Sequence, residues 1–417
     1  MNLNISRKIT KVLLTILLVS IACIFATSCN YNGKRVINWR NDLEYLAKEL
    51  PKNHINLYFK LSEKEFKNEI NTLNKNVPKL NDDQIMVELM KIVSSIGDEH
   101  TMIGYSTNDI FPVKFYWFED GIYVIDTIAE YSEINQCKLS KINGIDIKKI
   151  LEDVNNLIPH SNEQWVKHRM PYIIMSPTVL HGMGIIDGAD KVTYTLINNK
   201  GSEFHIDIKS IKLDSLQWLN AFNKEAPLYR KNSDKYYWYE YLSKENTIYY
   251  KHNVCRDQEN NPFIDFSIDL FDTIKNKKPQ KLIIDLRNNS GGDSKYVDNI
   301  TTKINLTAPE LNEKGKLYII IGRETFSSAV LNCVYAKQNS EAIFVGEDTG
   351  GKPNDYSEVQ LMELPNSKIK LQYSTKKFDD YDKDVDTFEP DINVKMNSTD
   401  YFENRDPVLE TILKAKN

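Results

Sequence analysis

Apolar runs alternate with polar turns most clearly between Leu282 and Lys352. Three runs of strand length, residues 282–286, 317–321 and 342–345, each stop at a turn rich in polar residues or glycine. Helical patterns fill the intervals, one of them from about residue 329 to 337. Strands that alternate with helices predict a mostly parallel sheet, whose ligands collect at the edge where strands give way to helices.

Ser327 and the pair Gly291-Gly292 fall at that edge. A serine at a sharp strand-to-helix turn holds its hydroxyl exposed, and the next amide, that of Ser328, faces the same point. Glycine lets the backbone approach a ligand closely, so Gly291 or Gly292 is expected to supply a second amide to a developing oxyanion. The pattern indicates acyl transfer. The alternative is that Ser327 and Ser328 only cap a core helix.

Three ordered blocks carry a family resemblance: Asp285–Gly292 (DLRNNSGG), Thr325–Ala329 (TFSSA) and Gly346–Lys352 (GEDTGGK). They resemble the C-terminal processing (tail-specific) protease and tricorn-core serine peptidases. The resemblance implies a ClpP/crotonase-like α/β catalytic core, Ser327 as the nucleophile, a polypeptide substrate and no cofactor.

Two residues, His100 and Lys352, are candidates for the general base that accepts the proton of Ser327. Imidazole has a suitable pKa, and in the tricorn branch a histidine at the place of His100 serves as the base. In the processing proteases a lysine at the place of Lys352 serves instead, in a Ser–Lys dyad. The tricorn branch also implies an orienting acid near the end of the chain, for which Asp384 and Asp386 lie at about the right offset. His252, after a predicted strand, is a lesser candidate for the base.

Three departures from the processing-protease pattern favour His100 over Lys352. Residues 353–356 (PNDY), directly after Lys352, are not the usual continuation of that branch. Val330 stands where that branch has a glutamate after the nucleophile, and Gln338 stands where it has a functional aspartate. Two other functions remain open: a catalytically inactive peptide-binding relative, and an acyl ester hydrolase on the same fold.

The N-terminal residues have the pattern that is typical of a targeting segment. Arg7, Lys8 and Lys11 precede an apolar run, residues 12–25, and small residues lead to Cys29. This resembles a bacterial lipoprotein signal, which implies cleavage before Cys29, lipidation of its thiol, membrane attachment and an extracytoplasmic place in the cell envelope. An uncleaved membrane anchor is the alternative.

The composition limits the class of protein to which the chain can belong. The 417 residues are 41% hydrophobic and 27% charged, enough for two or three domains with a sizeable core. The formal net charge of −5 argues against nucleic-acid binding. After loss of the signal, Cys137, Cys255 and Cys333 are too few and too widely spaced for a disulfide framework, and their spacing gives no metal site.

We expect four parts: a signal peptide (1–28), a helical N-terminal unit (29–98), a PDZ-like mixed β region (99–215) and the catalytic domain (216–417). Residues 139–144 (LSKING) resemble a turn of a PDZ module, which is why the third part is expected to be PDZ-like. Such a module either binds a chain terminus as an added strand or is only a structural insert.

Near the end of the chain, residues 357–364, 369–374 and 392–394 are predicted as antiparallel finishing strands, and 407–414 as a closing helix. The aromatic stretch 236–241 is either core or a peptide-binding wall.

Overall fold

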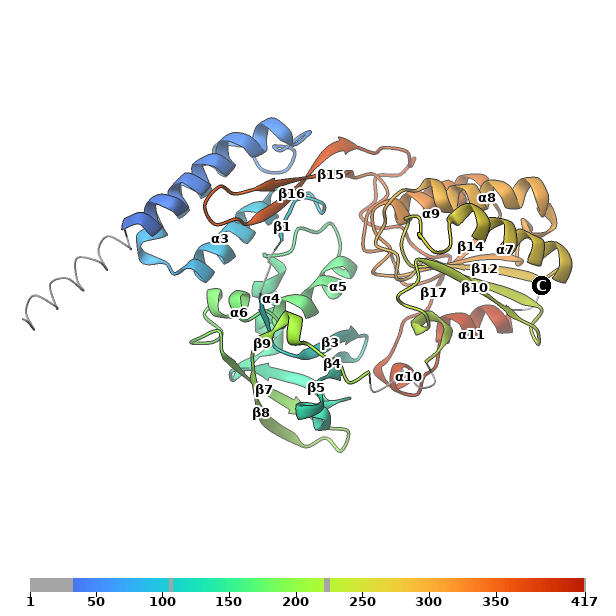
Figure 1. Cartoon of the computed structure of the whole chain (residues 1–417), viewed down its shortest axis with the longest axis horizontal. Helices are drawn as coiled ribbons and strands as arrows, with labels where there is room; N and C mark the ends of the chain where they lie inside the picture. Colours follow the sequence, from blue (N-terminus) through green and yellow to red (C-terminus); the bar gives the residue numbers. More distant parts are fainter. Residues whose placement is uncertain (1–32, 105–107, 221–225, 416–417) are drawn as a thin grey trace, which may run out of the picture.

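The computed structural model describes residues 33–104, 108–220 and 226–415 (Figure 1). The predicted signal peptide and Cys29 lie outside the described residues. Among the helices described, none combines the length and the apolar character that crossing a membrane requires.

The catalytic part is a six-stranded sheet whose strand order is β10-β11-β12-β13-β14-β17. All neighbours run parallel except β10, which is antiparallel to β11 at the edge. The mostly parallel sheet predicted from the sequence is therefore confirmed. The strands are β10 (Tyr237–Leu242), β11 (Thr247–His252), β12 (Lys281–Asp285), β13 (Leu317–Ile321), β14 (Ile343–Gly346) and β17 (Ile392–Asn393).

The two faces of this sheet pack against different helices, as the strand period of two requires. Leu282 and Ile284 face the helices α7 (Phe263–Lys277), α8 (Lys295–Thr307) and α9 (Ser328–Asn339). Ile283, between them, faces α11 (Pro407–Lys414), the predicted closing helix. Because both faces are covered, the strands are apolar at nearly every position, which explains the continuous apolar runs.

Helices form the N-terminal unit, as predicted. They are a first helix over residues 33–53, α2 (Glu63–Asn76) and α3 (Asp82–Ser95). Reciprocal capping boxes begin α2 and α3: Ser62 pairs with Glu65, and Asn81 with Gln84.

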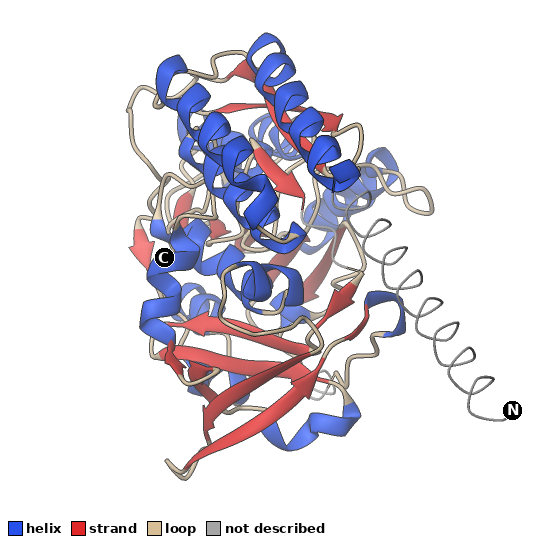
Figure 2. Ribbon diagram, turned by 90° about the vertical axis from the view of Figure 1, so that its left-hand side faces the viewer, coloured by secondary structure: helices blue, strands red, loops and turns tan. Residues whose placement is uncertain are grey.

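The region predicted as PDZ-like forms a second six-stranded sheet, fully antiparallel, with β6 pairing only with β5. Its strands gather in the lower part of Figure 2, below the helix-rich catalytic part. Strands β7 and β8 form a hairpin across the turn at 198–202. The strands are β3 (Val113–Phe118), β4 (Gly121–Thr127), β5 (Lys138–Ile142), β6 (Ile145–Asp146), β7 (Lys191–Ile197) and β8 (Glu203–Lys209).

Helices interrupt this region: α4 (Ile147–Asn155), α5 (Glu163–Ile174) and α6 (Pro177–Gly182). The apolar positions of α5 and α6 are nearly all buried and give no amphipathic stripe that would mark these helices in the sequence. The remaining short elements are β2 (Asp109–Ile110), which pairs with β9 (Ile211–Lys212), and α10 (Ser398–Phe402).

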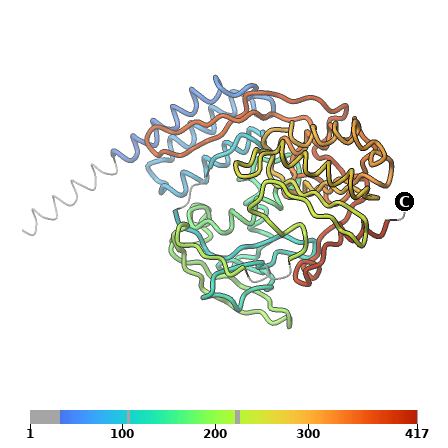
Figure 3. The backbone as a smooth tube through the Cα atoms, turned by 45° about the vertical axis from the view of Figure 1, so that its right-hand side comes forward, coloured from blue at the N-terminus to red at the C-terminus, as the bar shows by residue number. Residues whose placement is uncertain are grey.

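A long hairpin joins the catalytic part to the N-terminal unit. Strands β15 (Tyr356–Glu363) and β16 (Lys370–Lys377) leave the catalytic part and lie beside the N-terminal helices, where β16 pairs with β1 (Met102–Gly104) (Figures 1 and 3). Asp42, buried on the first helix, fastens the tip by accepting amide hydrogen bonds from Asn366 and Ser367 at 2.8 and 2.7 Å.

The structure decides two further expectations from the sequence, one on residues 392–394 and one on residues 236–241. Residues 392–393 form a strand, but β17 runs parallel to β14 in the catalytic sheet, so the antiparallel prediction was wrong there. A two-residue strand carries no turn signal that fixes its direction. The aromatic stretch 236–241 belongs to β10, where Tyr237 and Trp238 are buried in the two cores, so it is core rather than an exposed wall.

Candidate active site

Ser327 occupies the strained turn between β13 and α9. Its φ of 53° and ψ of −130° lie outside the regions that non-glycine residues prefer. It precedes the first residue of α9, yet its side chain makes no capping hydrogen bond. The hydroxyl is partly exposed, and its one described contact is the hydroxyl of Ser357 on β15, at 3.5 Å. The local geometry is therefore that of an exposed nucleophile turn and not of an ordinary cap.

The glycine loop after β12 lies directly against this serine. A Cβ added to Gly291 would come within 2.8 Å of the Cβ of Ser327 and 3.2 Å of its Oγ. A Cβ added to Gly292 would collide with the carbonyl oxygen of Cys255 at 2.1 Å. Both glycines have positive φ, 109° and 134°. Only glycine satisfies both the backbone conformation and the spacing, so the loop can stay close to the nucleophile.

The amides of this loop are not equivalent. Gly291 donates its amide to Oδ1 of Asn289 at 2.9 Å. Within the described parts of the chain, the amides of Gly292 and Ser328 have no acceptor. Of the three residues predicted to hold an oxyanion, Gly292 and Ser328 therefore keep a free donor.

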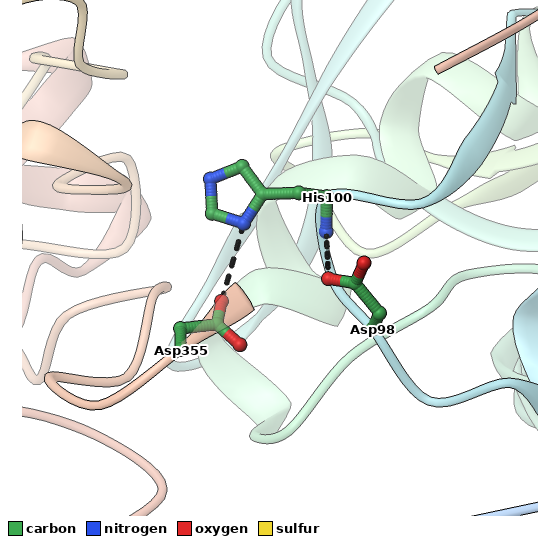
Figure 4. A group of neighbouring side chains, drawn as sticks. All are labelled: Asp98, His100 and Asp355. Atoms are coloured by element: carbon green, nitrogen blue, oxygen red, sulfur yellow. Dashed lines mark hydrogen bonds and ion pairs between the residues drawn. The ribbon is translucent and has the colours of Figure 1, made fainter. Parts of the chain in front are cut away.

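His100 lies beside the nucleophile turn. Its ring stacks on Phe326, the residue before Ser327, with centroids 4.5 Å apart. Its Nδ1 lies 3.2 Å from Oδ2 of Asp355, and its amide donates to Asp98 (Figure 4). Its Nε2 is buried and has no hydrogen-bond partner among the described residues. One ring nitrogen is thus held by a carboxylate while the other is free, and no hydrogen bond yet joins it to Ser327.

Asp98 fixes the loop that carries His100. Besides the His100 amide, this buried carboxylate accepts hydrogen bonds from Thr101 and from Nε2 of His54, at 2.9 Å for the latter. Nδ1 of His54 accepts the amide of Asn56, so the ring proton sits on Nε2 and points at Asp98. Burial works to raise the pKa of Asp98, but the hydrogen bond from His54, the charge of His100 and the hydrogen bond from Thr101 together outweigh it and hold the pKa below its usual value.

Lys352 and Glu99 complete the polar cluster. Nζ of Lys352 lies 3.7 Å from Oδ1 of Asp355, so lysine and histidine share one carboxylate. Glu99 is fully buried; Oε1 accepts the amide of Ser161 at 2.6 Å, and Oε2 has no partner in the described structure. Burial raises the pKa of Glu99 well above its usual value, and the charge of Asp355 adds to the shift.

Asp98, His100 and Asp355 each offer one ligand atom within 4.8 Å of the others, a grouping able to hold a cation. The donor set fits a metal poorly, however, because both oxygens of Asp98 already accept hydrogen bonds. We interpret the group as an orienting network for His100.

The remaining candidates lie apart from this cluster. His252 is buried, hydrogen-bonded to Tyr250, and burial lowers its pKa to about 3. Asp384 and Asp386 are exposed on a loop, and neither contacts His100. The carboxylate at His100 is Asp355, which corrects the expectation that the orienting acid lies near residue 385.

Sequence reasoning missed Asp355, Ser357 and Trp165. Trp165 on α5 stacks on Phe326 with centroids 3.9 Å apart, so Phe326 lies between indole and imidazole. Asp355 follows Lys352 by three residues, and the unusual sequence after Lys352 was the one available signal. Nothing in the sequence places Ser357 or Trp165 at the site, because hairpin and helix packing bring them there.

We predict that Glu99→Gln flattens the pH dependence of stability. From about pH 4.5 upward the folded protein keeps a proton on Glu99 that the unfolded chain has released, so the free energy of unfolding falls as pH rises. Relative to wild type, Glu99→Gln should therefore gain stability as the pH rises above about 4.5 in urea denaturation. Glu152→Gln, at an exposed position of α4, is the control. Parallel pH curves for wild type and Glu99→Gln would contradict the prediction.

Comparisons with known proteins bear on the fold. No protein-family model matches the chain, and neither does any curated protein. Among solved structures, mature CPAF complexed with lactacystin aligns with a TM-score of 0.63 and 13% identity, over 90% of this chain and 97% of that chain. A crystal structure of mature CPAF gives 0.63 and 12%, over 90% and 96%.

The tricorn protease also matches, with a TM-score of 0.43 and 14% identity, over 91% of this chain and 36% of that chain. We base the fold on the CPAF structures, whose scores are higher. The chain shares their fold over almost its whole length, which confirms the α/β fold class expected from its motifs.

Proposed function

We propose that the protein is a serine peptidase that hydrolyses peptide bonds through an acyl-enzyme on Ser327. The observation that carries the proposal is the strained, non-capping Ser327 beside His100, whose Nε2 is free and whose Nδ1 is held by Asp355. The site needs no cofactor for this chemistry.

The geometry supports a two-stage reaction. Oγ of Ser327 attacks the peptide carbonyl carbon, and Nε2 of His100 takes the hydroxyl proton. The amides of Gly292 and Ser328 stabilise the oxyanion of the tetrahedral intermediate. His100 then gives the proton to the departing amine. A water molecule, activated by the same imidazole, hydrolyses the acyl-enzyme.

We favour His100 over Lys352 as the base. Lys352 is engaged by Asp355, with its Nζ 3.7 Å from Oδ1 of that carboxylate. His100 has an unoccupied nitrogen, and the carboxylate holds its other nitrogen in place. The missing Ser327–His100 hydrogen bond fits this role, because such bonds are often long without substrate.

We propose that the protein is a lipoprotein of a bacterial cell envelope and that it acts on polypeptides outside the cytoplasm. Support comes from the sequence of residues 1–29, where a basic segment, an apolar run and small residues precede Cys29.

We predict that a serine-reactive fluorophosphonate labels wild type and fails to label Ser327→Ala, because only this serine has an activated hydroxyl. In-gel fluorescence of the full chain measures the result. Ser132→Ala, at an exposed serine outside the site, should label like wild type. No labelling of wild type would favour a non-catalytic peptide-binding protein. Labelling with turnover of small esters but not of unstructured peptides would favour an ester hydrolase.

The base is tested by three variants compared in parallel. We expect His100→Ala and Asp355→Asn each to lower kcat/KM about 10²- to 10⁴-fold, because the first removes the proton acceptor and the second its orienting partner. Lys352→Met should lower it less than either. Peptide hydrolysis rates provide the measurement. The reverse order, with Lys352→Met the most damaging, would support a Ser–Lys dyad.

We predict that Cys29→Ser abolishes incorporation of radiolabelled palmitate in bacterial expression and moves the protein out of the membrane fraction, since lipidation requires the thiol. Cys137→Ser serves as the control. Unchanged membrane attachment of Cys29→Ser would instead indicate an uncleaved anchor.

A further inference from the structure

A cavity of about 470 Å³ begins beside the nucleophile and extends toward the second sheet. Ser290, which borders it, immediately precedes Gly291, the glycine packed against Ser327. Strands β3 and β4 and helix α5 form much of the remaining wall, with aromatic side chains such as Tyr116 and Tyr172. A polypeptide bound at Ser327 can therefore place neighbouring side chains in this cavity.

The carboxylates that line the cavity are already engaged. Glu324 accepts a hydrogen bond from Asn288 at 3.2 Å and lies 3.7 Å from Nδ1 of His168. Asp126 accepts the amides of Thr127 and Asn220. These hydrogen bonds occupy carboxylate oxygens that a ligand could otherwise use, but they do not remove the charge of the carboxylates.

The cations of the wall divide into two groups. Arg323 makes a two-pronged ion pair with Glu347, and Lys167 pairs with Glu163. Arg230 and Lys114, also on the wall, form no ion pair with any described residue; Lys114 is exposed, whereas Arg230 is half-buried. Its guanidinium lies 4.1 Å from the ring centroid of Tyr401, a contact that leaves its charge without a carboxylate partner.

Arg230 also has unused donors. Its Nη2 donates to the carbonyl of Tyr401 and to Asn404, but Nε and Nη1 are buried with no partner. The hydroxyl of the adjacent Tyr229, on the same wall, is likewise buried and unpaired. Buried donors without acceptors cost free energy, and a charged one costs the most. An anionic oxygen would satisfy both residues, and arginine is well suited to a carboxylate.

We propose that this cavity binds a carboxylate of the polypeptide substrate through Arg230 and Tyr229, and so selects acidic substrates. The carboxylate belongs to an aspartate or glutamate side chain or to the end of the chain. This inference rests on the proposed peptidase function, but binding can be measured without turnover.

The test uses the full chain carrying Ser327→Ala and peptides labelled with an uncharged BODIPY dye. One neutral sequence carries a single Glu at each position in turn, with Gln in the matched peptide, and every peptide is made with a free and an amidated C-terminus. Fluorescence polarisation gives Kd. We expect at least one peptide with a carboxylate to bind about tenfold or more tightly than its uncharged counterpart.

Arg230→Gln should abolish that preference, and Arg230→Lys should retain part of it. Tyr229→Phe should weaken binding of the preferred peptide several-fold without lowering thermal stability, because it removes a hydroxyl that has no partner. This second variant keeps the test valid if Arg230→Gln folds poorly. Lys231→Gln, at the exposed neighbouring position, removes the same charge and should leave the preference intact.

The outcomes separate the possibilities. A preference that survives amidation identifies an acidic side chain, and one lost on amidation identifies the chain terminus; both support the inference. Equal binding of charged and uncharged peptides, no peptide binding at all, or an equal loss in Lys231→Gln would overturn it. If carboxylate peptides bind but the fluorophosphonate does not label Ser327, the peptidase proposal fails while the binding site stands.

Discussion

The pairing of β16 with β1 is the interaction on which the candidate site depends. Strand β1 begins two residues after His100, and the hairpin that contains β16 begins directly after Asp355. When the two strands pair, they bring together residues that are 255 positions apart in the sequence. Side chains reinforce the pairing, since Gln372 donates to the carbonyl of His100 and the amide of Ser374 donates to Thr101. The N-terminal helices, which hold the hairpin tip through Asp42, therefore contribute to the geometry of a site whose nucleophile, Ser327, lies far along the chain.

This arrangement explains what could and could not be read from the sequence. The strands of the catalytic sheet, the turn at Ser327 and the glycine loop are encoded locally, because apolar runs, turn residues and glycines fix them within a few positions. His100 was found through its place in a family pattern. Asp355 was missed because its partnership with His100 exists only after a strand from one part of the chain pairs with a strand from another. Asp384 and Asp386 were chosen by offset, and an offset does not report which loop folds back toward the imidazole.

The backbone of Ser327 is strained, and the residues packed around it hold it in that conformation. Holding a serine at positive φ costs of the order of 1–3 kcal/mol, which the structure tolerates only where packing determines the turn on all sides. Phe326, clamped between His100 and Trp165, provides that packing on one side, and the Gly291 loop provides it on the other. The same contacts that hold the strained turn also fix the distance between the hydroxyl and the imidazole ring. Packing and chemistry are consequently coupled, because the ring that is proposed to accept the proton also supports the backbone of its donor.

Buried polar atoms without hydrogen-bond partners gather near Ser327 and at the cavity. At the carboxyl end of β12 the buried charges are matched: Asp285 is bonded to Tyr249, Lys251 and Arg287. Near Ser327, Nε2 of His100 and Oδ1 of Asp355 are buried without hydrogen-bond partners among the described residues, and at the cavity the same holds for Tyr229 and Arg230. Nine further buried atoms of the described residues lack a partner; some lie beside the site, such as Oε2 of Glu99 and the hydroxyl of Ser328, and others lie elsewhere, such as the indole nitrogen of Trp238. Each such group lowers the stability of the folded chain by roughly 1–3 kcal/mol. That cost is recovered only when an incoming group pairs with these atoms, so such pairing favours the bound state over the free one.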